Sequence, residues 1–189
     1  MTNIIFFGPP GAGKGTQAKK ISDFFKLQHL STGEILRLKI SQKDELGLKL
    51  KDIIASGKLV SDDVLNEIVA EKIVTCKDTG FILDGYPRTL NQSQFLEKIL
   101  KNNFLKLNFI FNINITFDTL KNRIINRSKE EGREDDNLDA IKTRYDAYLQ
   151  TTTEVSNYYS SENPEIFFDI DGSDQIEEIT NKIKKIIVK

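Results

Sequence analysis

The 189-residue sequence contains few or none of several features that define whole classes of protein. Its one cysteine, Cys76, excludes a disulfide within the chain and a cysteine-based zinc site. No apolar run approaches the ~18 residues that a membrane span needs, and the N-terminus lacks the basic stretch of a signal peptide. Neither sign of charge dominates, because 27 Lys and Arg face 28 Asp and Glu. We therefore expect a cytoplasmic protein with neither nucleic acid nor membrane as a partner.

Hydrophobic residues make up 39% of the chain and charged residues 29%, which is typical of a folded globular protein. Short apolar runs alternate with longer segments of helical period. The expected strands are 3–7, 28–30, 80–84, 107–115 and 166–170, and the expected helices are 14–25, 33–42, 45–56, 62–75, 90–101, 117–127, 137–159 and 174–188. This alternation predicts an α/β fold in which helices flank a parallel sheet of five strands. One domain, 1–189, would carry two insertions, 31–60 and 128–136.

A glycine-rich segment, GPPGAGKGT (8–16), follows the first predicted strand and precedes the first helix. It fits the pattern G-x-x-x-x-G-K of a P-loop, in which backbone N–H groups point at phosphate oxygens. The N-terminus of the helix adds its positive dipole end, and Lys14 adds a mobile positive charge for the β- and γ-phosphates. The segment therefore predicts a nucleotide phosphate site.

One residue departs from the general P-loop pattern, which places Ser or Thr directly after the lysine to hold Mg²⁺. Here Gly15 intervenes before Thr16. Direct metal ligation by a hydroxyl of this loop is therefore not expected.

Four further motifs extend the pattern along the chain: LSTGEILR (30–37), GKLVSDD (57–63), LDGYPRTLNQ (83–92) and an arginine-rich C-terminal half. With the P-loop, in this order and spacing, the sequence resembles the adenylate kinase family. The Gly after the P-loop Lys is also the pattern of that family. The resemblance implies a P-loop NTPase fold with a helical AMP-binding insertion, and transfer of the terminal phosphoryl group of Mg-ATP to AMP, giving two ADP.

The resemblance also assigns roles to individual residues. ATP would contact the P-loop and the C-terminal half through Gly11, Ala12, Gly13, Lys14, Gly15, Thr16, Arg123, Arg127 and Gly172. AMP would contact Thr32, Arg37, Lys58, Leu59, Val60, Gly85, Tyr86, Pro87, Arg88, Gln92, Arg133 and Arg144. Within these sets, Lys14, Arg88, Arg123, Arg133 and Arg144 would act in catalysis, Gln92 would read the adenine edge, and Arg133 and Arg144 would bridge the lid and the transferred phosphate.

The resemblance also concerns metals and assembly. Mg²⁺ would be held mainly by phosphate oxygens and water, with Asp84 nearby. The segment 128–136 would be a short lid without structural zinc, since there are no cysteines there to hold one. A monomer acting on ATP, AMP and ADP is expected.

The chemistry of phosphoryl transfer independently favours these arginines. Two nucleotides bring several negative charges into one cleft, so a chain of net charge −1 must concentrate cations there. Arginine binds phosphate oxygens through a planar fork and stays charged. Arg123 and Arg127 are one helical turn apart and can face the same ligand.

Three other functions fit the sequence less well. A UMP/CMP kinase typically has Ala where Thr32 stands, so Thr32 and Gln92 favour AMP. A small GTPase needs a guanine-reading N-K-x-D motif, which the chain lacks. A pseudoenzyme scaffold is disfavoured because the charged positions expected of the family are filled. His29 and Cys76 are interpreted as structural.

Overall fold

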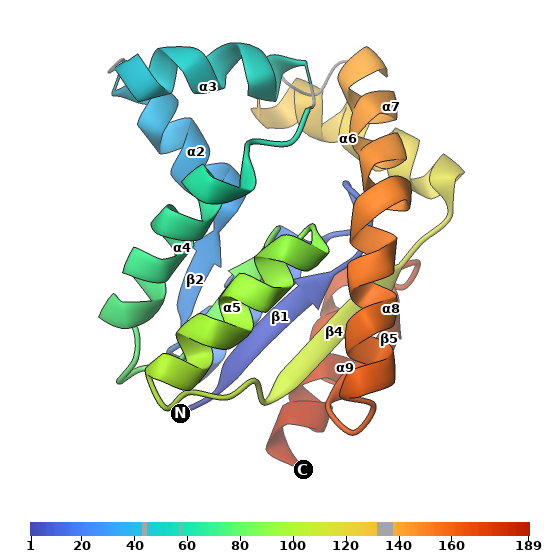
Figure 1. Ribbon diagram of the computed structural model, residues 1–189. Coiled ribbons are helices and arrows are strands. Elements are labelled where there is room, and N and C mark those ends of the chain that lie inside the picture. Colours follow the sequence, from blue (N-terminus) through green and yellow to red (C-terminus); the bar gives the residue numbers. More distant parts are fainter. Residues whose placement is uncertain (43–44, 57, 132–137) are drawn as a thin grey trace.

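The computed structural model describes residues 1–42, 45–56, 58–131 and 138–189. One sheet runs in the order β2-β3-β1-β4-β5, and all neighbouring strands are parallel (Figure 1). The strands are β1 (Asn3–Phe7), β2 (Gln28–Ser31), β3 (Phe81–Asp84), β4 (Phe109–Asn114) and β5 (Phe167–Asp171). The predicted α/β fold with five parallel strands is confirmed.

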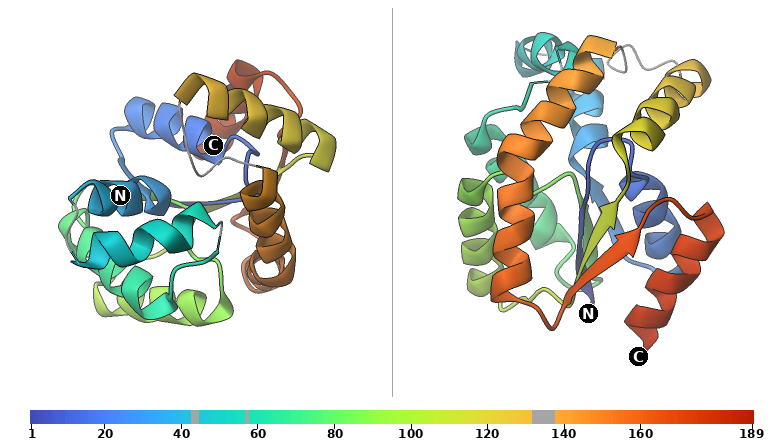
Figure 2. Two further views of the ribbon diagram at one scale, coloured as in Figure 1. Left: turned by 90° about the horizontal axis from the view of Figure 1, so that it is seen from above. Right: turned by 90° about the vertical axis from the view of Figure 1, so that its right-hand side faces the viewer.

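Helices cover both faces of this sheet. The described α-helices are α1 (Lys14–Phe25), α2 (Thr32–Ser41), α3 (Glu45–Ala55), α4 (Asp62–Thr75), α5 (Leu90–Asn102), α6 (Phe117–Glu131), α7 (Leu138–Ala147), α8 (Thr153–Glu162) and α9 (Ile176–Val188). Figure 2 shows α1 and α9 on one face and α4, α5 and α8 on the other. Side chains alternate along β1, so Ile4 joins the core beneath α1 and α9, while Ile5 joins the core beneath α4, α5 and α8. None of the described helices is both long and apolar enough for a membrane crossing.

The carboxyl ends of the strands all point to one end of the molecule. Two helix pairs, α2 with α3 and α6 with α7, stand above this end, whereas both chain termini lie at the opposite end (Figure 1). Strand β1 lies at the centre of the sheet, between β3 and β4. In open α/β sheets ligands bind beyond the carboxyl ends, so the loop after β1 occupies the centre of the expected ligand crevice.

Helix α6 is longer than its apolar pattern predicts. Its buried residues, Leu120 and Ile124, pack with Ile141 of α7, and the apolar period stops soon afterwards. The helix nevertheless continues to Glu131, so the first residues of the segment predicted as a lid loop are helical. Lys and Glu favour helix without any burial, which explains why hydrophobic period alone placed the end too early.

The long helix predicted over 137–159 is interrupted by a π-helical segment, η1 (Tyr148–Thr152). Threonine hydroxyls bond to backbone carbonyls around it: Thr151 Oγ1 donates to Ala147 O at 2.8 Å and Thr153 Oγ1 donates to Tyr148 O at 3.1 Å. Such bonds compete with the regular helix ladder, and π segments often occur at functional sites. The interruption begins four residues after Arg144, one of the predicted site residues.

Candidate active site

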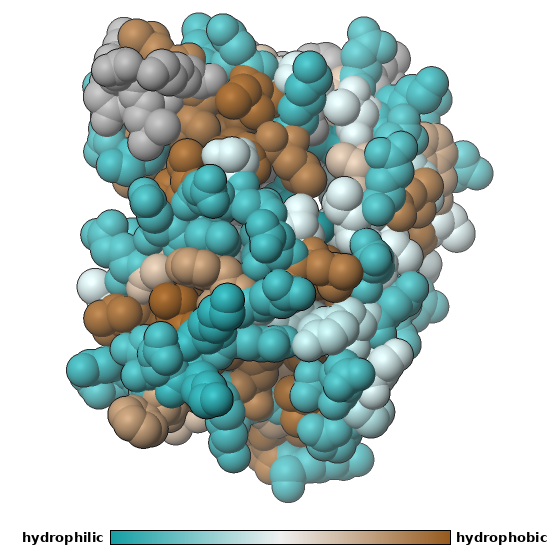
Figure 3. Space-filling view, in the orientation of Figure 1, coloured by the Kyte–Doolittle hydropathy of each residue, from teal (hydrophilic) through white to brown (hydrophobic). Residues whose placement is uncertain are grey.

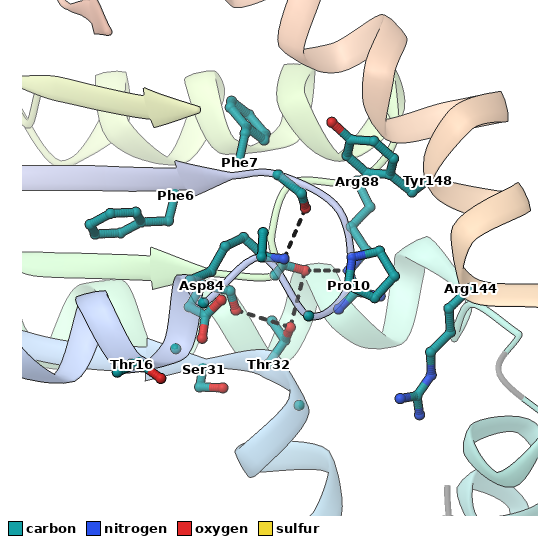
Figure 4. Close-up of a pocket in the computed structure, with 18 of the residues that line it drawn as sticks. Phe6, Phe7, Pro10, Thr16, Ser31, Thr32, Asp84, Arg88, Arg144 and Tyr148 are labelled. Atoms are coloured by element: carbon teal, nitrogen blue, oxygen red, sulfur yellow. Dashed lines mark hydrogen bonds between the residues drawn. The ribbon is translucent and has the colours of Figure 1, made fainter. Parts of the chain in front are cut away.

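A cavity of about 850 Å³ opens at the carboxyl ends of the strands. Its wall combines the loop after β1, the start of α2, the segment before α4, the turn after β3, and parts of α6, α7 and η1. Figure 4 shows side chains from the loop after β1, the start of α2, the turn after β3, α7 and η1 around one space. Figure 3 shows hydrophobic residues gathered on the outer face near α3 and the segment after it. The cavity is large enough for a sizeable polar ligand.

The loop after β1 has the backbone shape of a phosphate cradle. Gly13, the residue before α1, has a φ of 94°, a left-handed conformation that glycine adopts without steric cost. Lys14 opens the helix, and its ammonium donates to Gly8 O at 2.8 Å and to Pro9 O at 2.9 Å. The positive charge thus lies over the loop at a helix N-terminus, an arrangement that favours an anion.

Gly15 leaves room for a carboxylate. A Cβ atom at this position would lie 3.2 Å from Asp84 Oδ2, closer than most side chains approach. Asp84 ends β3, and only 12% of its side chain is exposed. Among the described residues no cluster of three or more His, Cys, Asp or Glu could hold a metal by itself. A lone carboxylate beside a phosphate loop fits Mg²⁺, which keeps several waters and takes one or two carboxylates with substrate phosphates.

Asp84 is surrounded by positive charge. Burial raises the pKa of its carboxyl, but a hydrogen bond with His29 and the charges of Lys14 and Arg88 outweigh burial, so the pKa lies below its usual value. His29 Nε2 lies 3.4 Å from Asp84 Oδ2. His29, interpreted from sequence as structural, therefore has a specific partner. In the β2–β3 register Asp84 lies opposite Ser31, two positions along β2 from His29.

The turn after β3 brings Thr32 and Arg88 together. Thr32 Oγ1 donates to Gly85 O at 3.1 Å, and Arg88 Nε donates to the same oxygen at 2.7 Å. Gly85 has a φ of 82°, and a Cβ there would lie 2.7 Å from Thr32 Oγ1 and 2.9 Å from Arg88 Nη2. Only glycine allows this close approach. Figure 4 shows the hydrogen bonds of the Thr32 hydroxyl.

The negative charge of Asp84 only partly offsets the burial of the Arg88 guanidinium. Burial lowers the pKa of its guanidinium, the negative charge of Asp84 opposes this effect, and the positive charge of Arg144 adds to it. An arginine stays protonated nonetheless. Two buried or partly buried cations close enough to repel favour binding of an anion between them.

Most residues predicted for the site share this one cavity. Those that line it are Gly11, Ala12, Gly13, Lys14, Gly15, Thr16, Thr32, Arg37, Lys58, Leu59, Val60, Asp84, Gly85, Tyr86, Pro87, Arg88, Arg123 and Arg144. They come from elements far apart in sequence, so the fold brings the motifs together as the resemblance implies.

Among the described residues that were predicted for the site, Gln92 and Gly172 do not line the cavity. Gln92 is 1% exposed, and its amide bonds to Arg88 N and to Asp62. A contact between Gln92 and adenine stays a prediction. Gly172 packs against Ile113 and Ile115, and its N–H donates to Asn114 O at 2.8 Å. A contact between Gly172 and ATP stays a prediction.

Other residues line the cavity but were not predicted from the sequence. Asp174, Gln175 and Ile176 line the cavity where Gly172 was expected to act. Gln17, which also lines it, donates from Nε2 to Ile176 O at 3.0 Å and accepts from Thr180 Oγ1 at 2.7 Å. The residues of this network are distant in sequence. Of them, only Gln17, which directly follows the P-loop, stands beside a predicted site.

The predicted lid cations cannot be placed in the same way. Arg127 belongs to the C-terminal part of α6, and its side chain is outside the described part of the structure. Arg133 lies outside the described residues altogether. Their roles stay predictions.

Comparison with known proteins decides the family. The model of the family described as adenylate kinase matches residues 6–164. The chain belongs to the adenylate kinase family. The curated adenylate kinase of Thermosipho melanesiensis is 38% identical, with 98% of this chain and 99% of that protein covered.

Two further adenylate kinases match over nearly their full lengths. That of Parabacteroides distasonis is 37% identical, with 99% of this chain and 98% of that protein covered. That of Leptospira biflexa is 38% identical, with 99% of this chain and all of that protein covered. The chain is therefore an enzyme, a phosphotransferase of the nucleoside monophosphate kinase type.

Proposed function

We propose that this cavity binds ATP at the P-loop and AMP beside the turn after β3, with their phosphates meeting between Lys14 and Arg88. As an adenylate kinase the enzyme catalyses reversible transfer of the terminal phosphoryl group of ATP to AMP, giving two ADP. The observation that supports the binding proposal most directly is the gathering of Lys14, Arg88, Arg123 and Arg144 in the lining of one cavity.

The ATP half is proposed to run from the P-loop toward α6. Backbone N–H groups of 11–16 would bind the phosphates, with Lys14 supplying charge and the arginines Arg123 and Arg127 holding the outer phosphates. Gln175 and Ile176 would border the base, since they line the cavity near α1.

The AMP half is proposed to lie between α2, the segment 58–60 and the turn 85–88. Thr32 and Arg37 would contact AMP from α2, and Lys58, Leu59 and Val60 would line the adenine pocket. Arg88 would grip the phosphate bidentately, with Arg144 facing it from α7. The positive charge of Arg144, which lowers the pKa of Arg88, supports this assignment.

Mg²⁺ is proposed to enter with ATP and to be held through water by Asp84. When bound, it neutralises negative charge on the phosphate oxygens. Asp84 stays ionised at neutral pH because its pKa lies below the usual value, and Gly15 leaves its carboxylate accessible to the loop.

The chain's own residues supply position and charge rather than covalent chemistry. The phosphate of AMP is already an anion, so its attack needs no base. Lys14 would stabilise charge that shifts toward the β–γ bridge, while Arg88, Arg123, Arg133 and Arg144 would hold donor and acceptor in line.

We also propose that the enzyme works as a monomer in the cytoplasm. Its exposed large hydrophobic residues, among them Phe24, Phe104 and Leu149, come from separate elements rather than one helix or strand. Sedimentation at micromolar concentration should give a single species of the mass of one chain. A stable dimer would contradict the proposal.

A coupled assay tests the substrate assignment. The enzyme receives Mg-ATP with AMP, CMP, UMP or GMP in turn, and ADP formation is recorded. AMP should give the highest kcat/KM. A higher value with CMP or UMP would overturn the proposed adenine pocket.

A further inference from the structure

Two polar side chains are buried where α1 packs against α9. Gln17, in the first turn of α1, is 2% exposed, and Thr180 of α9 is 1% exposed. The Thr180 hydroxyl donates to Gln17 Oε1 at 2.7 Å, and Gln17 Nε2 donates to Ile176 O at 3.0 Å. Both ends of the Gln17 amide are therefore bound to α9.

The single proton of the Thr180 hydroxyl decides how this network is arranged. Two acceptors lie within its reach, Gln17 Oε1 and Ile176 O, the latter at 2.8 Å. Ile176 O already accepts from Gln17 Nε2, so donation to Gln17 Oε1 leaves both oxygens with a donor. Turning the amide over would set its oxygen against Ile176 O, and neither of these atoms can donate. The hydroxyl thus fixes the Gln17 amide, and the amide holds the backbone at Ile176.

The network links two ends of the cavity. Gln17 comes directly after the P-loop, and its backbone N–H donates to Gly13 O at 3.0 Å. Ile176 begins α9 and lines the cavity together with Gln175. The Gln17 side chain therefore joins the phosphate loop to the residues that are proposed to border the base of ATP.

Other contacts between α1 and α9 determine this relation less closely. Ile21 of α1 and Ile179 of α9 belong to one apolar cluster, and apolar packing is not directional. Lys20 Nζ lies 2.6 Å from Glu177 Oε1, but these side chains are 39% and 71% exposed, and ion pairs at the surface contribute little. Buried hydrogen bonds are directional, so the Gln17 network adds a fixed register to this packing.

We propose that Thr180 is a positioning residue for ATP: it acts through Gln17 to hold the start of α9 where α9 meets the base, without touching the nucleotide. This inference rests on the proposed function, in which Gln175 and Ile176 border the base. Loss of the Thr180 hydroxyl should weaken the binding of ATP. Binding of a triphosphate without a base should stay the same, because the P-loop backbone and Lys14 remain in place.

Two pairs of side chains isolate the hydroxyl at position 180. Valine has nearly the shape of threonine without the hydroxyl, and alanine differs from serine by the hydroxyl alone. Thr180→Val and Thr180→Ala therefore lose the hydrogen bond to Gln17, whereas Thr180→Ser keeps it. Glu177→Gln is the matched control for contact between the two helices, because it breaks the exposed link to Lys20 and leaves the buried network intact.

The measurement is calorimetric binding in the absence of Mg²⁺, so that no phosphoryl transfer occurs. ATP is compared with AMP and with methyl triphosphate, which carries the triphosphate ester without the nucleoside. For Thr180→Val the Kd for ATP should rise about three- to tenfold, the scale of one hydrogen bond. The Kd values for methyl triphosphate and AMP should stay within about twofold of those of the unaltered enzyme. Thr180→Ser and Glu177→Gln should leave all three Kd values within the same range.

Several results would overturn the proposal. It fails if Thr180→Val binds ATP as tightly as the unaltered enzyme does. It also fails if methyl triphosphate is weakened as much as ATP, since the substitution would then only loosen α1 and the P-loop, or if Glu177→Gln weakens ATP to the same extent. If Thr180→Val does not fold, Thr180→Ala and Thr180→Ser decide, and equal binding of ATP by these two variants contradicts the proposal.

The unaltered enzyme separates this proposal from the proposed function. If it binds methyl triphosphate as tightly as ATP, the base adds nothing, and its placement at Gln175 and Ile176 is wrong. If ATP binds more tightly and the Thr180 variants do not reduce the difference, only the positioning role of Thr180 is wrong.

Discussion

At the scale of single residues, Lys14 places its own positive charge where the P-loop meets the first helix. Its ammonium bonds to two carbonyls of its own loop, Gly8 O and Pro9 O, which keep it over the position proposed for the phosphates. A cation held in this way stabilises the transition state more than the ground state, because charge shifts toward it as the bond breaks.

We expect Lys14→Ala to lower kcat by about 10²-fold or more, the scale seen when one preorganised donor is removed. Steady-state kinetics with ATP and AMP measure it, and circular dichroism checks that the variant is folded. A rise in KM with kcat intact would show that Lys14 only binds.

Gly85 offers a second residue-scale prediction, since its left-handed backbone and its closeness to Thr32 and Arg88 both exclude a side chain. Gly85→Ala should cost about 1–2 kcal/mol of folding free energy from the backbone alone, and should also raise the KM for AMP. Urea unfolding and kinetics measure the two effects. Gly33→Ala is the control, because an added Cβ there meets only the movable end of Arg37. Equal stability of the Gly85 and Gly33 variants would contradict the prediction.

Individual site residues were predictable where they belong to a continuous motif. Lys14, Thr32 and Arg88 each stand in such a motif, and each lines the cavity. The link between Asp62 and Gln92 joins residues 30 positions apart, and that between Gln17 and Thr180 spans 163 positions. No local pattern marks such pairs, because only the folded chain makes them neighbours.

At the scale of elements, the contact between α1 and α9 depends on a buried polar network. Thr180, 1% exposed, donates to Gln17 Oε1, and Gln17 in turn donates to Ile176 O. This network joins the helix that follows the P-loop to the residues that border the cavity at 174–176.

Removing the hydroxyl of Thr180 should weaken the contact between α1 and α9. Thr180→Val leaves Gln17 Oε1 buried without its partner, and we expect a loss of about 1–3 kcal/mol in the free energy of unfolding, measured by urea denaturation. Thr75→Val is the control, since Thr75 is exposed and bonds only locally, to Lys72 O and Cys76 Sγ. If both substitutions cost the same, the network does not contribute as proposed.

The bounds of helices and strands were predictable from the sequence where buried apolar residues determine them. The apolar period correctly placed α1 and α4, whose buried faces are regular. It placed the end of α6 too early because the last residues there, RSKEE, are polar and carry no apolar period, although Arg, Lys and Glu favour helix. It could not foresee η1, which depends on hydroxyl-to-carbonyl bonds rather than on hydrophobic pattern.

At the scale of the whole molecule, charge is distributed unevenly. The net charge is only −1, yet the cavity gathers Lys14, Arg37, Arg88, Arg123 and Arg144. Attraction of anionic nucleotides is therefore a property of the cleft and not of the overall surface.

Salt should weaken this attraction. The screening length falls from about 10 Å at 0.1 M to about 3 Å at 1 M ionic strength, so the KM for AMP should rise several-fold over this range. Initial rates at increasing KCl measure it, with a constant excess of Mg-ATP. The free energy of unfolding, measured in parallel, controls for general destabilisation. A KM that stays constant with salt would show that fixed hydrogen bonds, rather than long-range charge, determine AMP binding.

Both chain termini lie at the amino ends of the strands, at the opposite end of the molecule from the cavity. Met1 and Val188 are 73% and 71% exposed, so neither end is packed into the core. A fluorescent domain or a surface anchor attached to either end would consequently leave the nucleotide entrance clear. Turnover by single tethered molecules can thus be followed on a solid support without the attachment blocking the catalytic cleft.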